Sequence, residues 1–218
     1  MAAGDILRAL LALVIGLLLG SVLPADFFAR LRGLDIRETG DGNPGTINTM
    51  RVLGRTPGLI TAVYDISVGI AAIQIAYLLG VSTGLAYLAG IMSIVGHRFP
   101  VFRGFRGGGQ GMAASAGMLV YGIGVALSRG WLGTADIGGI VAILAVTYLL
   151  THSDSTAGMV MLPILVIRLG LAHADWQFLA FMAAVAGHIW IVQAVGTRRQ
   201  IPLRTARPAH EGRTSERR

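Results

Sequence analysis

The 218-residue sequence has no cysteine and no lysine, and charged residues of any kind are scarce. The absence of cysteine excludes disulfides and thiolate metal sites. Charged residues make up 13% of the chain and hydrophobic residues 54%, whereas an ordinary soluble domain has about 25% charged residues. The chain therefore lacks the side chains for a polar surface, and we expect an integral membrane protein built almost entirely of helices.

Long apolar runs occupy most of the chain. A helix needs about 20 mostly apolar residues to cross a bilayer. Seven candidate runs occur, of which the third and sixth are short; without those two the count would be four to six. The runs are Ile6–Leu23, Pro57–Leu79, Thr83–Gly96, Met112–Ser128, Ala135–Leu150, Gly158–Leu169 and Trp176–Val195. We predict one all-α membrane domain over residues 1–197 with about seven transmembrane helices.

The basic residues, all of them arginine, predict the topology. Of the 18 arginines, five lie in the loop 24–56, three in the loop 97–111 and seven in the segment 198–218. With seven spans these three segments fall on one side, which the positive-inside rule makes cytoplasmic. We therefore predict an N-terminus outside and a C-terminus inside, with residues 198–218 as a basic, disordered cytoplasmic tail. Because the charge follows topology, we expect no nucleic-acid partner.

The first cytoplasmic loop (24–56) contains a glycine-rich string from Gly40 to Arg51. Glycines at 40, 42 and 45 let backbone N–H groups converge, and such nests bind anions, above all phosphate. Asn48 and Arg51 are three residues apart and share a face if a helix begins here. Arg51 could hold a phosphate through two parallel hydrogen bonds. The alternative is a simple glycine–proline turn between membrane segments.

The second cytoplasmic loop (97–111) has glycines at 107, 108, 109 and 111, directly before an apolar run. Flexible glycine backbone leading into a helix N-terminus suits an anion. Arginines precede the glycines, and Phe99, Phe102 and Phe105 recur every three residues, which favours contact with the lipid interface. An interfacial or re-entrant turn is the alternative. Two such loops on one face predict a phosphate-bearing ligand at the cytoplasmic membrane surface.

Two ionisable residues are expected inside the membrane. Asp65 and His188 each lie about 10 residues from the cytoplasmic side, or roughly 15 Å along a helix. Ionisable groups at that depth are usually functional, although a purely structural pair is an equal alternative. We predict that the two side chains face each other at the floor of the site. A polar path through the membrane, as in a small channel or transporter, is a further alternative.

The order and spacing of these motifs resemble the bacterial acyl-phosphate:glycerol-3-phosphate acyltransferases, the PlsY family. The resemblance covers roughly residues 15–125. The matching segments are Gly20-Ser21-Val22-Leu23-Pro24, Asp35-Ile36-Arg37, Gly40 to Arg51, Asp65-Ile66-Ser67-Val68-Gly69, Gly96-His97-Arg98-Phe99-Pro100 and Gly107 to Gly111.

The resemblance implies a seven-span enzyme of the bacterial inner membrane with a cytoplasmic site and no metal or organic cofactor. Such enzymes transfer an acyl chain from acyl phosphate to the 1-hydroxyl of glycerol 3-phosphate, which gives lysophosphatidic acid. Membrane lipid is a further partner, and the sequence carries no signal for an oligomeric state. The candidate general bases are His97, His188 and Asp41. The candidate phosphate or substrate ligands are Asn43, Gly45, Asn48, Arg51, Arg103, Arg106, Gly107, Gly108, Gln110 and Gly111, with Asp65 as the intramembrane polar residue.

Several positions depart from the family pattern. Asp41 replaces a serine, and Val68 and Gln110 replace lysines. Near the end of the last run, Ile191 and Ala194 occupy the positions of an asparagine and an arginine. Arg103 or Arg106 could take over from the missing lysines. The departures leave open a catalytically impaired or repurposed homologue that binds lipid or phosphate.

Overall fold

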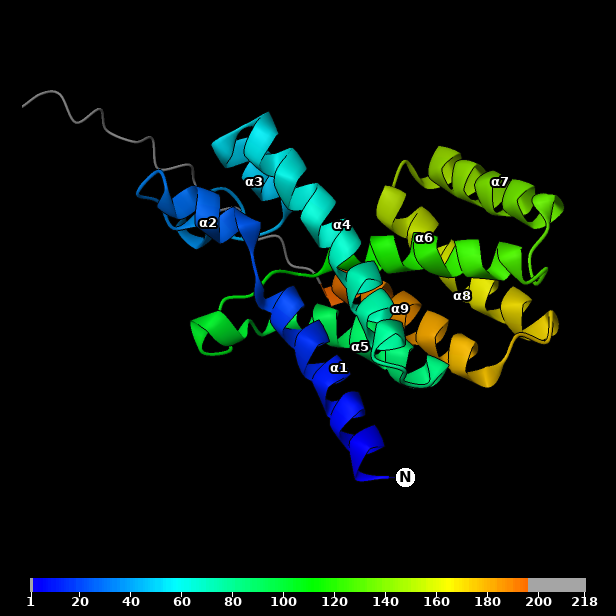
Figure 1. Ribbon diagram of the computed structural model, residues 1–218. Coiled ribbons are helices and arrows are strands. Elements are labelled where there is room, and N and C mark those ends of the chain that lie inside the picture. The colour runs from blue at the N-terminus through cyan, green and yellow to red at the C-terminus, as the bar shows by residue number, and fades with distance from the viewer. Residues whose placement is uncertain (1, 196–218) are drawn as a thin grey trace, which may run out of the picture.

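The computed structural model describes residues 2–195, and helices are the regular structure within that range (Figure 1). The long helices coincide with the seven predicted apolar runs, so each run is confirmed as helical. They are α1 (Ala3–Ser21), α4 (Arg55–Leu78), α5 (Thr83–Arg98), α6 (Met112–Ser128), α7 (Thr134–Thr151), α8 (Asp154–Leu171) and α9 (Trp176–Val195). The predicted tail, 198–218, lies outside the described residues.

Five of these segments are long and apolar enough to cross a membrane by length and composition, namely those that begin with α1, α4, α5, α7 and α9. The third predicted run reaches spanning length only when the short 3-10 helix at 101–103 is counted with α5, which makes a segment from Thr83 to Arg103. Helix α6 and the apolar part of α8 are shorter. An all-helical integral membrane protein is confirmed, while seven crossings and the orientation of the termini stay predictions.

Short helices shape the first loop and the start of the second. They are α2 (Pro24–Arg30), η1 (Ile36–Glu38), α3 (Thr46–Leu53) and η2 (Val101–Arg103). Proline is favoured in the first turn of a helix, where its missing N–H costs nothing, and Pro24 begins α2 in this way. Gly45 precedes α3 with an extended backbone. Figure 1 shows α2 and α3 beside the same end of α4, where these loops gather.

Helices α1 and α5 approach each other closely through small residues. A Cβ atom at Gly16 would collide with the carbonyl group of Ala89, and one at Gly20 with that of Ser93. On the facing helix, a Cβ at Gly96 would collide with the carbonyl of Leu17. Glycines four residues apart permit such backbone contact in lipid, where dispersion rather than the hydrophobic effect holds helices together. This contact sets the position of α5, which carries His97.

The core lies between α4, α5, α6, α8 and α9. Phe178 and Phe181 of α9 are buried, and Tyr87 of α5 stacks on Phe181 with ring centroids 4.7 Å apart. Met118 of α6 and Met182 of α9 fill the space beside them. Large apolar side chains on the outer faces of the helices remain exposed, as expected for surfaces that contact lipid.

Helix α7 packs at the side of the bundle against α8 (Figure 1). None of its residues is buried. Arg168 of α8 donates two hydrogen bonds to the carboxylate of Asp136, from Nε at 2.7 Å and from Nη2 at 3.1 Å. The pair joins the beginning of α7 to the end of α8 and lies at the end of the bundle opposite the two loops.

The α1–α5 contact predicts that Gly20→Ala destabilises the protein. Overpacking a close contact costs about 1–3 kcal/mol, so the thermal midpoint in detergent should fall by several degrees. Gly4→Ala is the matched control, because no atom lies within 4 Å of a Cβ built at Gly4 on the same helix. Equal midpoints for the two variants would contradict the contact.

Candidate functional site

The two predicted loops meet at one end of the bundle. The side-chain oxygen Oδ1 of Asn43 accepts a hydrogen bond of 3.1 Å from the backbone N–H of Gln110. Nε of Arg37 donates to the carbonyl oxygen of Gly107. The glycine-rich string of the first loop and the glycines of the second therefore form one surface, as predicted, directly before the N-terminus of α6.

Asn48 holds the first loop in shape from the inside. Its side chain is buried, and Nδ2 donates to the carbonyl oxygens of Ile36 at 3.3 Å and Thr39 at 3.0 Å. Its Oδ1 accepts from the backbone N–H of Asp41 at 3.1 Å. Gly40 has φ +62°, and a Cβ there would collide with Oδ1 of Asn48. The role of Asn48 as a phosphate ligand stays a prediction; in the structure its amide is engaged by the loop itself.

Arg51 faces a carboxylate of its own loop. Nη1 of Arg51 lies 3.4 Å from Oδ2 of Asp41, whose Oδ1 accepts from the N–H of Asn43 at 3.0 Å. The Arg51 side chain is 48% exposed and that of Asp41 21%. Exposed pairs of this kind are weak, typically below about 1 kcal/mol. A phosphate bound to Arg51 would nevertheless have to displace Asp41 or bind beside a negative charge.

Gly45 and Thr46 form the start of α3. The carbonyl of Gly45 accepts from both N–H and Oγ1 of Thr49. Oγ1 of Thr46 is buried and has no hydrogen-bond partner among the described residues. A buried hydroxyl without a partner is uncommon. Thr46 was not among the predicted site residues, although its position directly after Gly45 in the glycine-rich string was a signal for it.

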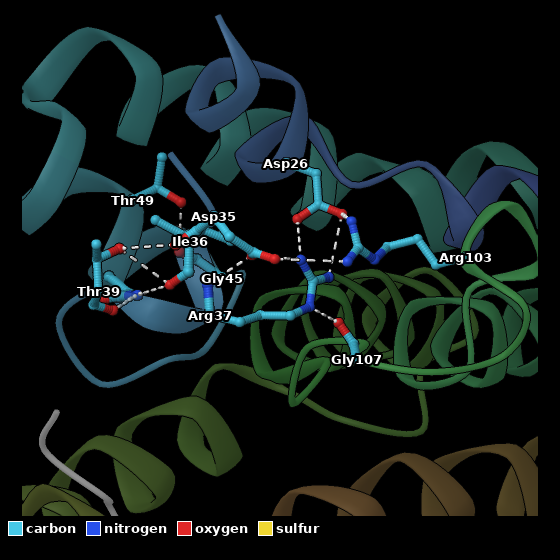
Figure 2. Close-up of polar contacts among 10 residues, drawn as sticks. Asp26, Asp35, Ile36, Arg37, Thr39, Gly45, Thr49, Arg103 and Gly107 are labelled. Carbon is cyan, nitrogen blue, oxygen red and sulfur yellow. Dashed lines mark hydrogen bonds and ion pairs between the residues drawn. The ribbon is translucent and has the colours of Figure 1, made fainter. Parts of the chain in front are cut away.

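A charged cluster, which we call the Arg37 cluster, joins the loops (Figure 2). Arg37 binds both oxygens of Asp26, with Nη1–Oδ1 2.5 Å and Nη2–Oδ2 3.1 Å. Arg103 lies 3.4 Å from Asp26 and 3.7 Å from Asp35. Arg103 was predicted to face a phosphate, but two carboxylates already engage its guanidinium.

Asp35 remains ionised within the Arg37 cluster. Partial burial favours the neutral acid, but the backbone N–H and the guanidinium of Arg37, with a smaller effect from Arg103, outweigh it and hold the pKa of Asp35 below its usual range. A lowered pKa means that this contribution to stability is present above the pKa of an unfolded aspartate and is lost as the pH falls through the lowered value. Asp35 therefore carries its negative charge at neutral pH.

The glycines of the second loop lie against His97. The N–H of Gly109 donates to the carbonyl of His97 at 2.9 Å. A Cβ at Gly109 would collide with Nε2 of His97, and one at Gly108 with the carbonyls of His97 and Arg98. The loop can lie here only because these residues have no side chain. His97 itself is 2% exposed, so it lies beneath the loop backbone and supports it.

Asp65 lies beside His97, which corrects the prediction that it faces His188. Oδ1 of Asp65 is 3.8 Å from Nδ1 of His97, and both residues are buried. That oxygen has no hydrogen-bond partner within residues 2–195. The prediction failed because it compared only depth in the membrane. Helix α4 packs against α5, so the nearest histidine to Asp65 is the one on α5.

His188 reaches the second loop from α9. Its Nδ1 lies 2.8 Å from Oγ of Ser115, one turn into α6. Gly111 has φ +71°, and a Cβ built there would lie 3.3 Å from Cε1 and 3.7 Å from Nε2 of His188. His188 therefore lies next to the last glycine of the loop. Ser115 was not predicted, although its position four residues after Gly111 placed it on the helix that the glycines introduce.

The remaining predicted positions differ in their surroundings. Arg106 is exposed, and within residues 2–195 no ion pair engages it. Val68 is buried in the core. Ile191 is 58% exposed, and Ala194 is exposed as well. These two α9 positions, where the family pattern has polar residues, face outward.

A cavity of about 260 Å³ lies at the opposite end of the bundle. Its lining includes Thr83, Tyr87, Arg129, Trp131, Asp175 and Gln177. Between this cavity and the loops lie the buried apolar side chains of Met118, Phe178, Phe181 and Met182. This packing disfavours a polar path from one face to the other, and with it the channel or transporter alternative.

Comparison with known proteins gives matches over most of the chain. Residues 10–199 match the family described as Glycerol-3-phosphate acyltransferase. Glycerol-3-phosphate acyltransferase 1 of Deinococcus radiodurans is 44% identical over 113 residues, which are 52% of this chain and 57% of that protein. The Glycerol-3-phosphate acyltransferase of Parasynechococcus marenigrum is 34% identical over 172 residues, 78% of this chain and 76% of that protein.

A solved structure has a similar fold. The crystal structure of PlsY (YgiH), an integral membrane glycerol 3-phosphate acyltransferase, in its glycerol 3-phosphate form, superposes with a TM-score of 0.64 at 24% identity. The superposition covers 88% of this chain and 94% of that one. A second crystal structure, the lysophosphatidic acid form, has a TM-score of 0.62.

The Arg37 cluster predicts that Arg37→Gln loosens both loops. The substitution removes charge-assisted bonds to Asp26 and the bond to Gly107, so amide hydrogen exchange should become faster in 107–111 and in 24–30. Arg32→Gln is the control, since Arg32 is exposed and outside the cluster. Equal exchange rates in 107–111 for the two variants would contradict the role of Arg37 in holding the loops together.

Proposed function

The chain belongs to the glycerol-3-phosphate acyltransferase family, and we propose that it transfers an acyl chain from an acyl phosphate to the 1-hydroxyl of glycerol 3-phosphate. The products are lysophosphatidic acid and inorganic phosphate. The observation that carries the proposal is the junction of two glycine-rich loops, joined through Asn43 and Gln110, at the N-terminus of α6. Bacterial relatives support a location in a bacterial inner membrane.

The reaction forms one bond and breaks one. The 1-hydroxyl oxygen attacks the carbonyl carbon of the acyl phosphate, the bond from that carbon to the phosphate oxygen breaks, and the hydroxyl proton goes to a base. Backbone N–H groups of a glycine-rich loop at a helix N-terminus suit both the substrate phosphates and the developing oxyanion. The site would therefore act mainly by positioning and by electrostatic stabilisation.

The three candidate bases differ in how accessible they are to a substrate bound at the loops. His97 is covered by the backbone of Gly108 and Gly109, so we assign it a supporting role. Asp41 borders the site on the solvent side and His188 borders Gly111. The proposed phosphate contacts are Arg51, the side-chain amide of Gln110 and the backbone N–H of Gly111. Arg106 follows as a cation of the second loop that forms no ion pair within residues 2–195.

Activity is tested with purified protein, an acyl phosphate and glycerol 3-phosphate, with lysophosphatidic acid measured by mass spectrometry. We expect product formation, and Arg51→Ala should lower kcat/KM at least roughly tenfold, because a charged hydrogen bond to phosphate is worth about 1.5–3 kcal/mol. Arg55→Ala, an exposed arginine close by at the start of α4, should keep the rate. Product formation no faster than in Arg51→Ala would refute the catalytic proposal and favour an inactive, phosphate-binding homologue.

The Asp41–Arg51 pair predicts that Asp41→Asn binds glycerol 3-phosphate more tightly. A carboxylate about 4 Å from the bound anion costs roughly 1–4 kcal/mol depending on the local dielectric. Because the pair is partly exposed, we expect the lower end, or about a tenfold lower Kd. Isothermal titration calorimetry measures the change independently of turnover. Asp5→Asn at the far end of α1 serves as the control, and an unchanged Kd in Asp41→Asn would exclude competition by Asp41.

A further inference from the structure

Ser115 and His188 form a polar pair within the packed helices. Ser115 is 0% exposed, and its Oγ lies 2.8 Å from Nδ1 of His188. Ser115 belongs to the first turns of α6 and His188 to α9, so the contact ties the helix that follows the glycines to the last helix of the bundle. The tautomer of His188 decides whether its other nitrogen, Nε2, can donate or only accept a hydrogen bond.

The hydrogen-bonding of Ser115, compared with that of other helical serines, identifies the tautomer of His188. Several other helical serines donate to a carbonyl three or four residues earlier in their own helix, as Ser21 does to Leu17 and Ser93 to Gly90. The hydroxyl of Ser115 makes no such bond, and its partner is Nδ1 of His188. If His188 were the donor, the hydroxyl hydrogen of Ser115 would be buried without an acceptor, which costs about 1–3 kcal/mol.

The hydrogen bond from Ser115 therefore fixes which nitrogen of His188 carries the proton. With Nδ1 accepting from Ser115, the proton of a neutral imidazole lies on Nε2. That nitrogen lies near Gly111, at 3.7 Å from a Cβ built on it. An N–H group at this position adds a donor to the glycine backbone that leads into α6, where an anion is favoured.

We propose that Ser115 is a positioning residue that holds His188 in the tautomer with the proton on Nε2. His188 is thereby a hydrogen-bond donor to a phosphate held at the second loop, and it is not the base that takes the hydroxyl proton. The inference rests on the proposed function for the identity of the anion. It leaves Asp41 as the remaining base candidate beside the loops.

The kinetic test compares Ser115→Ala with Ser93→Ala in the acyltransferase assay. Both serines are buried in helices, but the hydroxyl of Ser93 serves only its own helix. We expect Ser115→Ala to raise the KM for glycerol 3-phosphate about tenfold with little change in kcat, since a donor to a bound anion is weakened. Ser115→Thr, which keeps the hydroxyl, should restore a KM close to that of the wild type.

The tautomer is tested without turnover. The chain has 5 histidines, so 15N-histidine NMR in micelles is tractable, and His188→Gln assigns the signals of His188. We expect an unprotonated Nδ1 and a protonated Nε2 in the wild type, and a mixture in Ser115→Ala. Ser93→Ala should leave the pattern unchanged.

Three results would overturn the proposal: a proton on Nδ1 in the wild type, no change in tautomer or KM in Ser115→Ala, or an acyl group found on Ser115 by intact-mass spectrometry with the acyl donor. The NMR result separates this inference from the proposed function. If the wild-type protein makes no lysophosphatidic acid but shows the expected tautomer, the proposed acyl transfer is refuted. The inference that Ser115 positions His188 then still stands.

Discussion

The guanidinium of Arg37 joins α2 and η1 of the first loop to the second loop, 70 residues further along the chain. It binds Asp26 of α2, lies beside Asp35 at η1 and donates to the carbonyl of Gly107 in the second loop. Irregular backbone is tolerated in a membrane protein only where protein or water satisfies its polar groups. A planar cation with several donors meets that need for both loops at once, so the geometry of the proposed site depends on this contact.

Glycine has two uses in this chain. In α1 and α5 it permits backbone contact between helices, as at Gly20 against Ser93. In the second loop it permits the backbone to lie on the ring of His97. The two are linked, since the α1–α5 contact places the helix that carries His97, and His97 in turn supports Gly109. Substitutions in the helices can therefore alter the loop without touching it.

The charges around the loops determine how strongly the proposed site would attract a phosphate. Arg103 is neutralised by carboxylates, and Arg51 is paired with Asp41. The electrostatic attraction for an anion is therefore modest, and neutral donors become more important. Backbone N–H groups before α6 and the ring N–H of His188 are such donors, and they keep their orientation because α6 and α9 pack around them.

The sequence by itself determined the membrane class, the seven apolar helices, and the two glycine-rich loops with their family resemblance, because composition, run length and motif spacing are local properties. It did not determine which polar groups meet. Asp65 lies with His97 instead of His188, Asn48 faces the interior of its loop, and Ser115 was not foreseen. These contacts depend on which helices are neighbours and how each is rotated about its axis. Only the packing of the whole bundle decides that.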